Sequence, residues 1–148
     1  CRNMMLLILN QYEQMRPLSE VDIRGLHYEL MSPYQGAYVV GKYKEQPNFV
    51  VEINHTTRSR RVVFETAEAG PITSAAMTEL VSWYNSSLNE NEHTIFRVSE
   101  FVYRFLAIHP FQDGNGRLGR GLFLLGLLQS SNIAIGKLKK EKRSITSP

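Results

Sequence analysis

One stretch decides the fold and the chemistry of this chain: His109-Pro110-Phe111-Gln112-Asp113-Gly114-Asn115-Gly116-Arg117-Leu118-Gly119-Arg120. Gly114 and Gly116 permit backbone conformations that a Cβ would block, so successive N–H groups can converge on an anion. A helix that begins just after them adds free amide donors and the positive end of its dipole. This combination predicts a phosphate-binding turn.

Side chains in the same stretch suit phosphate chemistry. Arg117 and Arg120 lie three residues apart, so on a helix both guanidinium groups reach one side of an anion. Asp113 can hold a divalent cation that bridges phosphate oxygens. His109 has an ordinary pKa near neutrality and can take a proton from an incoming nucleophile. A metal-hydrolase pair of His109 and Asp113 is a weaker alternative, because no further His, Asp or Glu nearby completes a ligand set.

The stretch resembles the signature of the Fic family, His-x-Phe-x-(Asp/Glu)-Gly-Asn-Gly-Arg-x-x-Arg, and meets every defined position. The likeness extends loosely from about Ser19 to Ser131. Leu26-His27-Tyr28-Glu29-Leu30-Met31 resembles the early helix of the family, and Gly41-Lys42-Tyr43-Lys44 stands where many members have Gly-x-Tyr/Phe-Arg. Pro71–Asn85 resembles the helix that follows a hairpin called the flap.

The resemblance implies a protein adenylyltransferase, which moves AMP from ATP to a Ser, Thr or Tyr hydroxyl of a target protein with Mg²⁺ as cofactor. In that scheme His109 is the general base, Asp113 is the magnesium ligand, and Arg120 meets the γ-phosphate. Asn115 holds nucleotide phosphate, and a left-handed turn conformation there is compatible with this role. The residues implied for nucleotide and phosphate binding are Gly114, Asn115, Gly116, Arg117 and Arg120.

Partners and alternative activities follow from the same resemblance. The flap aligns the target by strand addition, with Val50, Val51 and Ile53 as candidates, although an ordinary buried hairpin is an alternative. ATP and a hydroxyl-bearing protein are the expected partners, and self-modification is an alternative to a separate target. The scaffold also supports another nucleotide or phosphocholine donor, phosphoryl transfer, removal of AMP, or a catalytically inactive binding module.

Other residues receive structural interpretations. Phe111 is predicted to anchor the signature loop in the core, and His27 is predicted to be a satisfied structural histidine. His55 and His93 lie in polar segments and are predicted to face solvent. Ser86-Ser87-Leu88-Asn89-Glu90-Asn91 matches a short inhibitory pattern of the family, but so loose a pattern arises often by chance.

Hydrophobic periodicity predicts an all-α fold of five or six helices around a central buried helix, with one β-hairpin. The resemblance implies that this is a Fic-like bundle and that the hairpin is its flap. The central helix is the nearly all-apolar Leu118–Leu128. A polar loop between two β-branched runs predicts the hairpin over Asn48–Thr66. The other helices are predicted over Met4–Arg16, from the Ser19 cap, from Pro71, and over Thr94–Ile108.

Composition and charge bear on the number of domains and on the cellular location. With 43% hydrophobic and 21% charged residues, the chain is predicted to form one globular domain, and the resemblance implies a Fic domain over residues 19–131. Residues 1–18 are read as a helix of a truncated upstream region, and the basic residues 132–148 as a disordered tail. A net charge of +3 gives little support for nucleic-acid binding, and no apolar window predicts a membrane span. Cys1 is the one cysteine, so a reducing, cytoplasmic location is expected.

Overall fold

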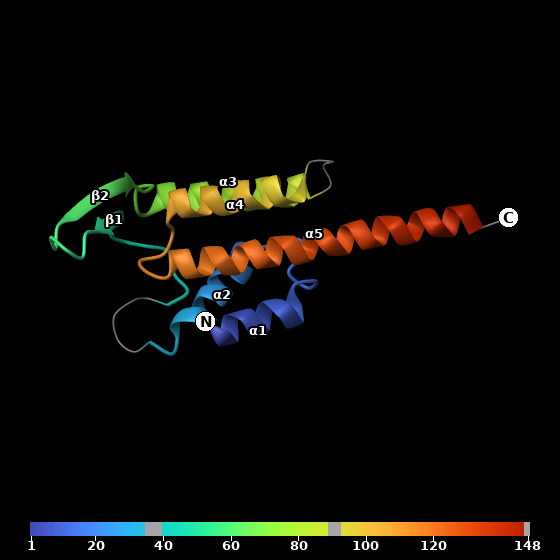
Figure 1. Cartoon of the computed structure of the whole chain (residues 1–148), viewed down its shortest axis with the longest axis horizontal. Helices are drawn as coiled ribbons and strands as arrows, with labels where there is room; N and C mark the ends of the chain where they lie inside the picture. The colour runs from blue at the N-terminus through green and yellow to red at the C-terminus, as the bar shows by residue number, and fades with distance from the viewer. Residues whose placement is uncertain (35–39, 89–92, 147–148) are drawn as a thin grey trace.

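The computed structural model describes residues 1–34, 40–88 and 93–146, and it shows a helical domain from which one β-hairpin projects (Figure 1). In chain order the elements are α1 (Arg2–Gln11), α2 (Glu20–Met31), β1 (Phe49–Ile53), β2 (Arg60–Glu65), α3 (Pro71–Ser87), α4 (Thr94–Ile108) and α5 (Asn115–Thr146). The predicted fold class, helical with one hairpin, is confirmed.

Local sequence sets several helix ends. Asp22 N donates to Ser19 Oγ at 3.1 Å and Ser19 N donates to Asp22 Oδ2 at 3.0 Å, which forms a capping box at the start of α2. Pro71 is the first residue of α3, where its missing N–H leaves no helical bond unmade. The helix predicted over Thr94–Ile108 is found with these bounds as α4, and it ends where His109 turns left-handed.

The first helix ends earlier than predicted. The sequence predicts a helix over Met4–Arg16, whereas α1 ends at Gln11 and a turn follows. The Gln129 side chain of α5 donates Nε2 to the carbonyls of Tyr12 (2.9 Å) and Met15 (3.0 Å). Because a distant side chain satisfies these carbonyls, the segment has no need of another helical turn.

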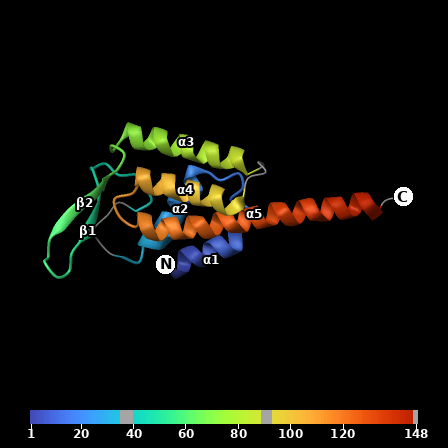
Figure 2. The ribbon, with the colours of Figure 1, turned by 45° about the horizontal axis from the view of Figure 1, so that its top comes forward.

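α5 is the central helix, as predicted. Figures 1 and 2 show it running between α4 on one side and α1 and α2 on the other. The side chains of Leu118, Leu122 and Leu125 are fully buried. A Cβ added at Gly126 would lie 2.8 Å from Val98 Cγ1, so the missing side chain lets α4 and α5 approach closely.

The tail prediction is wrong for most of its length. Residues 132–148 are predicted to be disordered, whereas α5 continues to Thr146 and extends past the other helices in Figure 1. The segment contains four Lys, one Glu and one Arg, which favour helix, and the buried half of α5 already supplies the helical nucleus. No helix in the described part of the chain is both long and apolar enough to cross a membrane.

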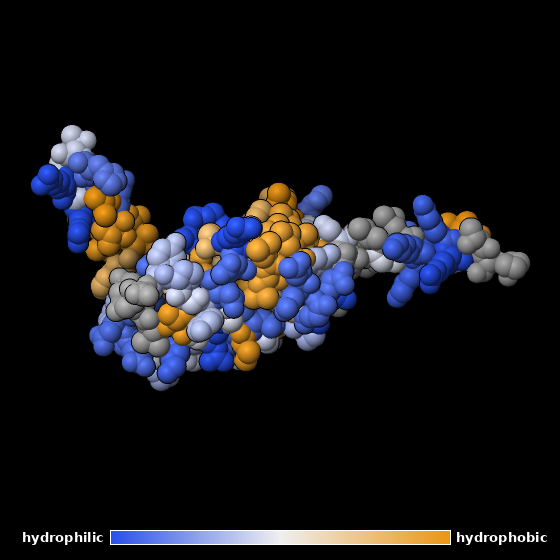
Figure 3. All heavy atoms as spheres, turned by 90° about the horizontal axis from the view of Figure 1, so that it is seen from below, coloured by the Kyte–Doolittle hydropathy of each residue, from blue (hydrophilic) through white to orange (hydrophobic). Residues whose placement is uncertain are grey.

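The hairpin stands away from the helical body (Figure 2). β1 and β2 pair antiparallel, with an irregularity between Val50 and Val51. Every residue of β2 is exposed, and in β1 only Val50 is half-buried, so the alternative of an ordinary buried hairpin is excluded. Val51 and Ile53 are 40% and 48% exposed, and Figure 3 shows hydrophobic side chains on the projecting hairpin, where they are available to another molecule.

Candidate active site

The signature stretch forms the tight connection between α4 and α5. Its two ends carry left-handed backbone conformations, φ 53° at His109 and φ 83° at Gly114. The glycine is required at the second position, because a Cβ there would also lie 2.8 Å from Met31 Sδ. The connection that carries these two turns lies at the end of the helical bundle from which the hairpin projects (Figure 1).

The His109 ring is held as a neutral base. Its Nδ1 lies 3.0 Å from the Leu106 carbonyl oxygen, which can only accept, so Nδ1 carries the proton and Nε2 presents a lone pair. Burial lowers the pKa of His109 below its ordinary value and the Lys44 cation lowers it further, while the Leu106 carbonyl and the Asp113 carboxylate oppose these effects. The imidazole is therefore ready to accept a proton at neutral pH.

Phe111 anchors the loop in the core, as predicted. It is fully buried, and its ring stacks on the His27 imidazole with centroids 3.9 Å apart. His27 Nδ1 accepts from Gly41 N and its Nε2 donates to Asp113 O, both at 2.9 Å. His27 is thus a satisfied structural residue, and burial lowers its pKa. His55 and His93 are exposed, also as predicted.

The backbone conformation of Asn115 differs from the left-handed turn considered from the sequence, and its side chain bonds the loop backbone. Its side chain is buried, accepts from Phe111 N at 2.9 Å and donates to Phe111 O at 2.7 Å. It lies at the start of α5 and does not adopt the left-handed turn, which falls instead on His109 and Gly114. In this structure Asn115 therefore fixes the loop, and the predicted phosphate contact of its side chain stays a prediction.

The N-terminus of α5 offers unpaired amide donors. The Leu118 amide donates to Gly114 O at 2.9 Å, so the amides of Asn115, Gly116 and Arg117 precede the hydrogen bonds within the helix. A Cβ added at Gly116 would meet nothing within 4 Å, so the space above the helix end is open. Gly116 is helical, and its predicted special backbone conformation is not found.

The two signature arginines flank this open space. Arg117 Nη2 lies 3.6 Å from Asp113 Oδ2, and its guanidinium lies over the Tyr34 ring at 5.3 Å. Arg120, one helical turn further on, is exposed and makes no hydrogen bond or ion pair with the described residues. Both cations can therefore turn to an anion at the helix N-terminus.

Asp113 is a suitable but incomplete metal ligand. Its Oδ1 accepts from Gly114 N at 2.7 Å, and its side chain is 47% exposed. No group of three or more His, Cys, Asp or Glu side chains that could hold a metal occurs in the described ranges. One open carboxylate beside unpaired backbone amides is compatible with Mg²⁺, which needs few protein ligands because it keeps several waters.

The sequence analysis does not identify Lys44, Asn48 and Thr66 as site residues. Lys44 is buried beside the signature loop, and Asn48 Nδ2 donates to His109 O (3.1 Å) and Phe111 O (2.8 Å). Thr66 Oγ1 donates to Asn48 Oδ1 at 2.6 Å. The available signal was Lys44 itself, a cation in the place where the family often has arginine.

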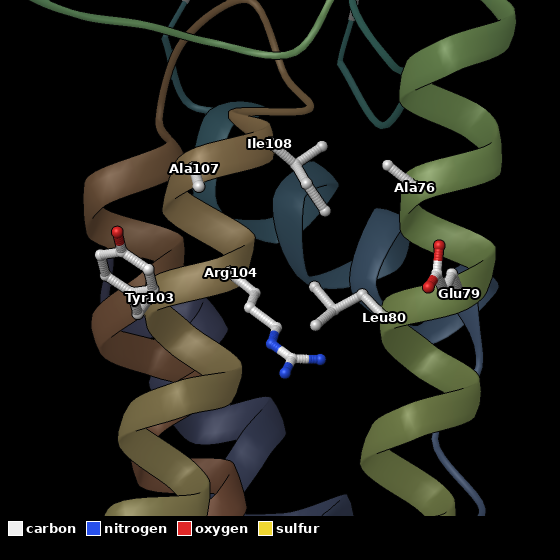
Figure 4. Close-up of a pocket in the computed structure, with 7 residues that line it drawn as sticks. All are labelled: Ala76, Glu79, Leu80, Tyr103, Arg104, Ala107 and Ile108. Carbon is white, nitrogen blue, oxygen red and sulfur yellow. The ribbon is translucent and has the colours of Figure 1, made fainter.

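Two grooves lie near the loop. One, of about 280 Å³ between α3 and α4, contains none of the predicted site residues, and Figure 4 shows Arg104 and Ile108 of α4 extending toward Leu80 of α3 across it. The other, of about 560 Å³, lies at the base of the hairpin and is lined in part by Asn48 and Thr66. The predicted flap residues Val50, Val51 and Ile53 lie on β1 and do not line this groove.

Comparison with known proteins identifies the family. The model of the Fic/DOC family matches residues 17–127, which is most of the chain. The chain therefore belongs to the Fic/DOC family. Its predicted boundaries at residues 19 and 131 stay predictions.

Solved structures agree with this assignment. A Fic-domain-containing signaling protein from Bacteroides thetaiotaomicron is 31% identical, with a TM-score of 0.70 over 85% of this chain and 45% of that one. A Fic family protein from Desulfovibrio desulfuricans is 27% identical, with a TM-score of 0.60 over 84% and 36%. Fic-1 from C. elegans, 20% identical with a TM-score of 0.62 over 86% and 36%, supports the fold alone. The chain spans less than half the length of these relatives.

Proposed function

We propose that this Fic domain transfers AMP from ATP to a Ser, Thr or Tyr hydroxyl of a protein. The observation that carries the proposal is the juxtaposition, in one loop, of a neutral His109 with a free Nε2 and an uncapped helix N-terminus flanked by Arg117 and Arg120. The acceptor for a nucleophile's proton and the donors for a polyphosphate thus lie a few residues apart in the sequence.

The triphosphate is expected over the first turn of α5. The free amides of Asn115, Gly116 and Arg117 point along the helix axis, and oriented amides with a helix dipole favour phosphate. Gly116 leaves room for the phosphate oxygens because no side chain fills that space. Arg120, exposed and one turn further on, is proposed to meet the γ-phosphate.

In the chemical step the target hydroxyl gives its proton to His109 Nε2. The hydroxyl oxygen then forms a bond to the α-phosphorus, and the bond from that phosphorus to the oxygen bridging to the β-phosphorus breaks. AMP is left on the target and pyrophosphate departs with the bond electrons. The chain supplies position and electrostatic stabilisation, as in other phosphoryl transfers.

Mg²⁺ is proposed to be held by Asp113, whose open carboxylate lies beside the amide turn. When bound, the ion would offset negative charge on the phosphate oxygens. Arg117, whose guanidinium lies 3.6 Å from the same carboxylate, would contact a phosphate oxygen at this helix end.

The target is proposed to add a strand to the hairpin. Within the described residues β1 pairs only with β2, so its other edge has unpaired backbone groups, and Val50, Val51 and Ile53 lie along it. A bound strand would make main-chain hydrogen bonds that are largely independent of sequence. A segment of this same chain is the alternative substrate, which would appear as self-labelling.

Radiolabelled ATP tests the proposal. The protein is incubated with Mg²⁺ and a cell extract, with ATP labelled at the α- or the γ-phosphate. Stable label on protein from α-labelled ATP alone is expected, and a loss of about 10²–10⁴-fold in His109→Ala is expected because a general base is removed. His93→Ala, which removes an exposed histidine, is the matched control. Label from γ-labelled ATP alone indicates a kinase, and no label indicates a binding module or another donor.

A further inference from the structure

A buried cation joins the signature loop to the base of the hairpin. Lys44 is only 2% exposed, and its Nζ donates to Asn48 Oδ1 (2.9 Å), Thr66 Oγ1 (2.9 Å) and Ile108 O (3.0 Å). Its backbone N donates to Pro110 O at 2.7 Å. All the acceptors are neutral, and burial lowers the pKa of Lys44 to about 8. Such an arrangement costs desolvation energy that a purely apolar contact would avoid.

The same contacts account for every backbone carbonyl from Ile108 to Phe111. Lys44 donates from Nζ to Ile108 O and from its backbone N to Pro110 O. Asn48 Nδ2 donates to His109 O and Phe111 O. These carbonyls bracket the left-handed turn at His109, whose φ of 53° is unfavourable for a residue with a Cβ. The donors therefore hold the backbone that aims the imidazole.

Asn48 and Thr66 lie at the two ends of the hairpin where it joins the rest of the chain. Asn48 directly precedes β1, and Thr66 directly follows β2. Thr66 Oγ1 donates to the Asn48 backbone carbonyl at 2.8 Å and closes the pair of strands. The strands and the His109 turn are thus fixed to one cluster, which consists of Lys44, Asn48 and Thr66.

We propose that the Lys44–Asn48–Thr66 cluster is a positioning unit that sets the distance and orientation between a target strand on the hairpin and the His109 base. The inference deepens the proposed function, on which it rests. The cluster residues are positioning residues: Lys44 and Asn48 bond backbone carbonyls of His109 and its neighbours, and Thr66 bonds Lys44 and Asn48. Positioning of this kind matters because a displacement of about 1 Å at a reacting centre can reduce the rate about 10²-fold.

Lys44 also acts on His109 through its charge. The groups that face His109 are the Leu106 carbonyl from α4, the Asp113 carboxylate from the loop, and the Lys44 ammonium from the segment before β1. Of these, Lys44 is the cation, and it disfavours the protonated imidazole. Loss of the Lys44 charge should therefore raise the pKa of His109, an effect that a merely structural lysine would not have.

The test compares variants in the AMP-transfer assay, with kcat expressed per ATP-binding site so that unfolded protein does not count. Lys44→Met is expected to lower kcat about 10- to 100-fold while KM for ATP changes less than about 2-fold. Lys44→Arg keeps the charge and the donors and should recover most of the loss. Lys42→Met removes an exposed lysine two residues away and should behave as the parent.

Thr66→Val supplies an independent test if Lys44→Met does not fold. Within the described residues the Thr66 hydroxyl bonds to Lys44 and Asn48 and has no hydrogen bond to the signature loop, so an effect on kcat is expected to pass through these two residues. A smaller loss with the same kcat and KM pattern is expected. Parent-like kcat in Thr66→Val and Lys44→Met, or a change confined to KM, would overturn the proposal.

The His109 titration separates this inference from the proposed function. NMR of the histidine ring protons follows the pKa of His109 without nucleotide or turnover. The pKa should be higher in Lys44→Met than in the parent and in Lys42→Met. If the parent transfers no AMP, the proposed function fails, yet the titration still decides: an unchanged His109 pKa in Lys44→Met would reject the role of Lys44.

Discussion

Two glycines in the signature loop should respond oppositely to the same mutation. At Gly114 a Cβ would lie 2.8 Å from Met31 Sδ, and φ is 83°. The left-handed conformation costs a residue with a Cβ about 1–2 kcal/mol, and the crowding adds about 1 kcal/mol or more. Gly114→Ala should therefore lower the free energy of unfolding by about 2–4 kcal/mol.

Gly116 lies two residues further on, within α5, and a Cβ there meets nothing within 4 Å. Gly116→Ala should keep or raise stability, by up to about 1 kcal/mol, because alanine is the better helix former. The new methyl group would occupy the space assigned to phosphate, however. Losing one charge-assisted amide contact of about 1.5–3 kcal/mol should weaken ATP about 10- to 150-fold.

Urea unfolding followed by circular dichroism measures the first effect, and calorimetric titration of Mg²⁺-ATP measures the second. In a thermal scan the Gly114→Ala loss corresponds to a Tm lower by roughly 5–15 °C. Parent-like stability in Gly114→Ala would refute the strain and crowding at that position. Parent-like ATP affinity in Gly116→Ala would refute the placement of the phosphates over the first turn of α5.

Three further predictions concern the remaining signature residues. Because the pKa of His109 is lowered, the base is neutral above 6.5, so kcat/KM should fall only as the pH drops below that value; a limb centred above it contradicts the assignment. Asp113→Ala should raise the Mg²⁺ concentration needed for half-maximal transfer, and turnover that persists unchanged in excess chelator excludes the metal role. Arg120→Ala should weaken ATP about 10- to 150-fold and AMP hardly at all in calorimetry; equal losses for both nucleotides would place Arg120 at the α-phosphate or in the fold.

The sequence predicts those features whose causes lie close together in the chain. The cap of α2 is formed by Ser19 and Asp22, which lie three residues apart, and the turn from α4 into α5 lies within one short motif. The role of Phe111 as an anchor was equally predictable, because an aromatic residue inside a polar loop has few other uses.

Features that depend on distant partners were missed or misread. The end of α1 depends on Gln129, which lies more than 110 positions further along the chain. The role of Lys44, one of six lysines, depends on contacts with Ile108 and Pro110 that form only in the folded chain. The composition of residues 132–148 predicts disorder because it treats the segment as isolated. In the structure the segment continues a helix that is already nucleated in the core.

The part of the pattern in Ser86–Asn91 that contains its glutamate lies outside the described residues, so the weak inhibitory match stays a prediction. ATP, Mg²⁺ and a protein target likewise remain proposed partners. The absence of nucleic-acid and membrane partners and the cytoplasmic location also remain expectations from the sequence.

A crystal structure of the His109→Ala variant with Mg²⁺ and ATP tests the central claim most directly. The account predicts the phosphates over the amides of Asn115 to Arg117, the ion at Asp113, and the α-phosphorus facing the space that the imidazole occupies in the parent. A nucleotide bound elsewhere, for instance in the groove between α3 and α4, or with its α-phosphate turned away from position 109, would contradict the account.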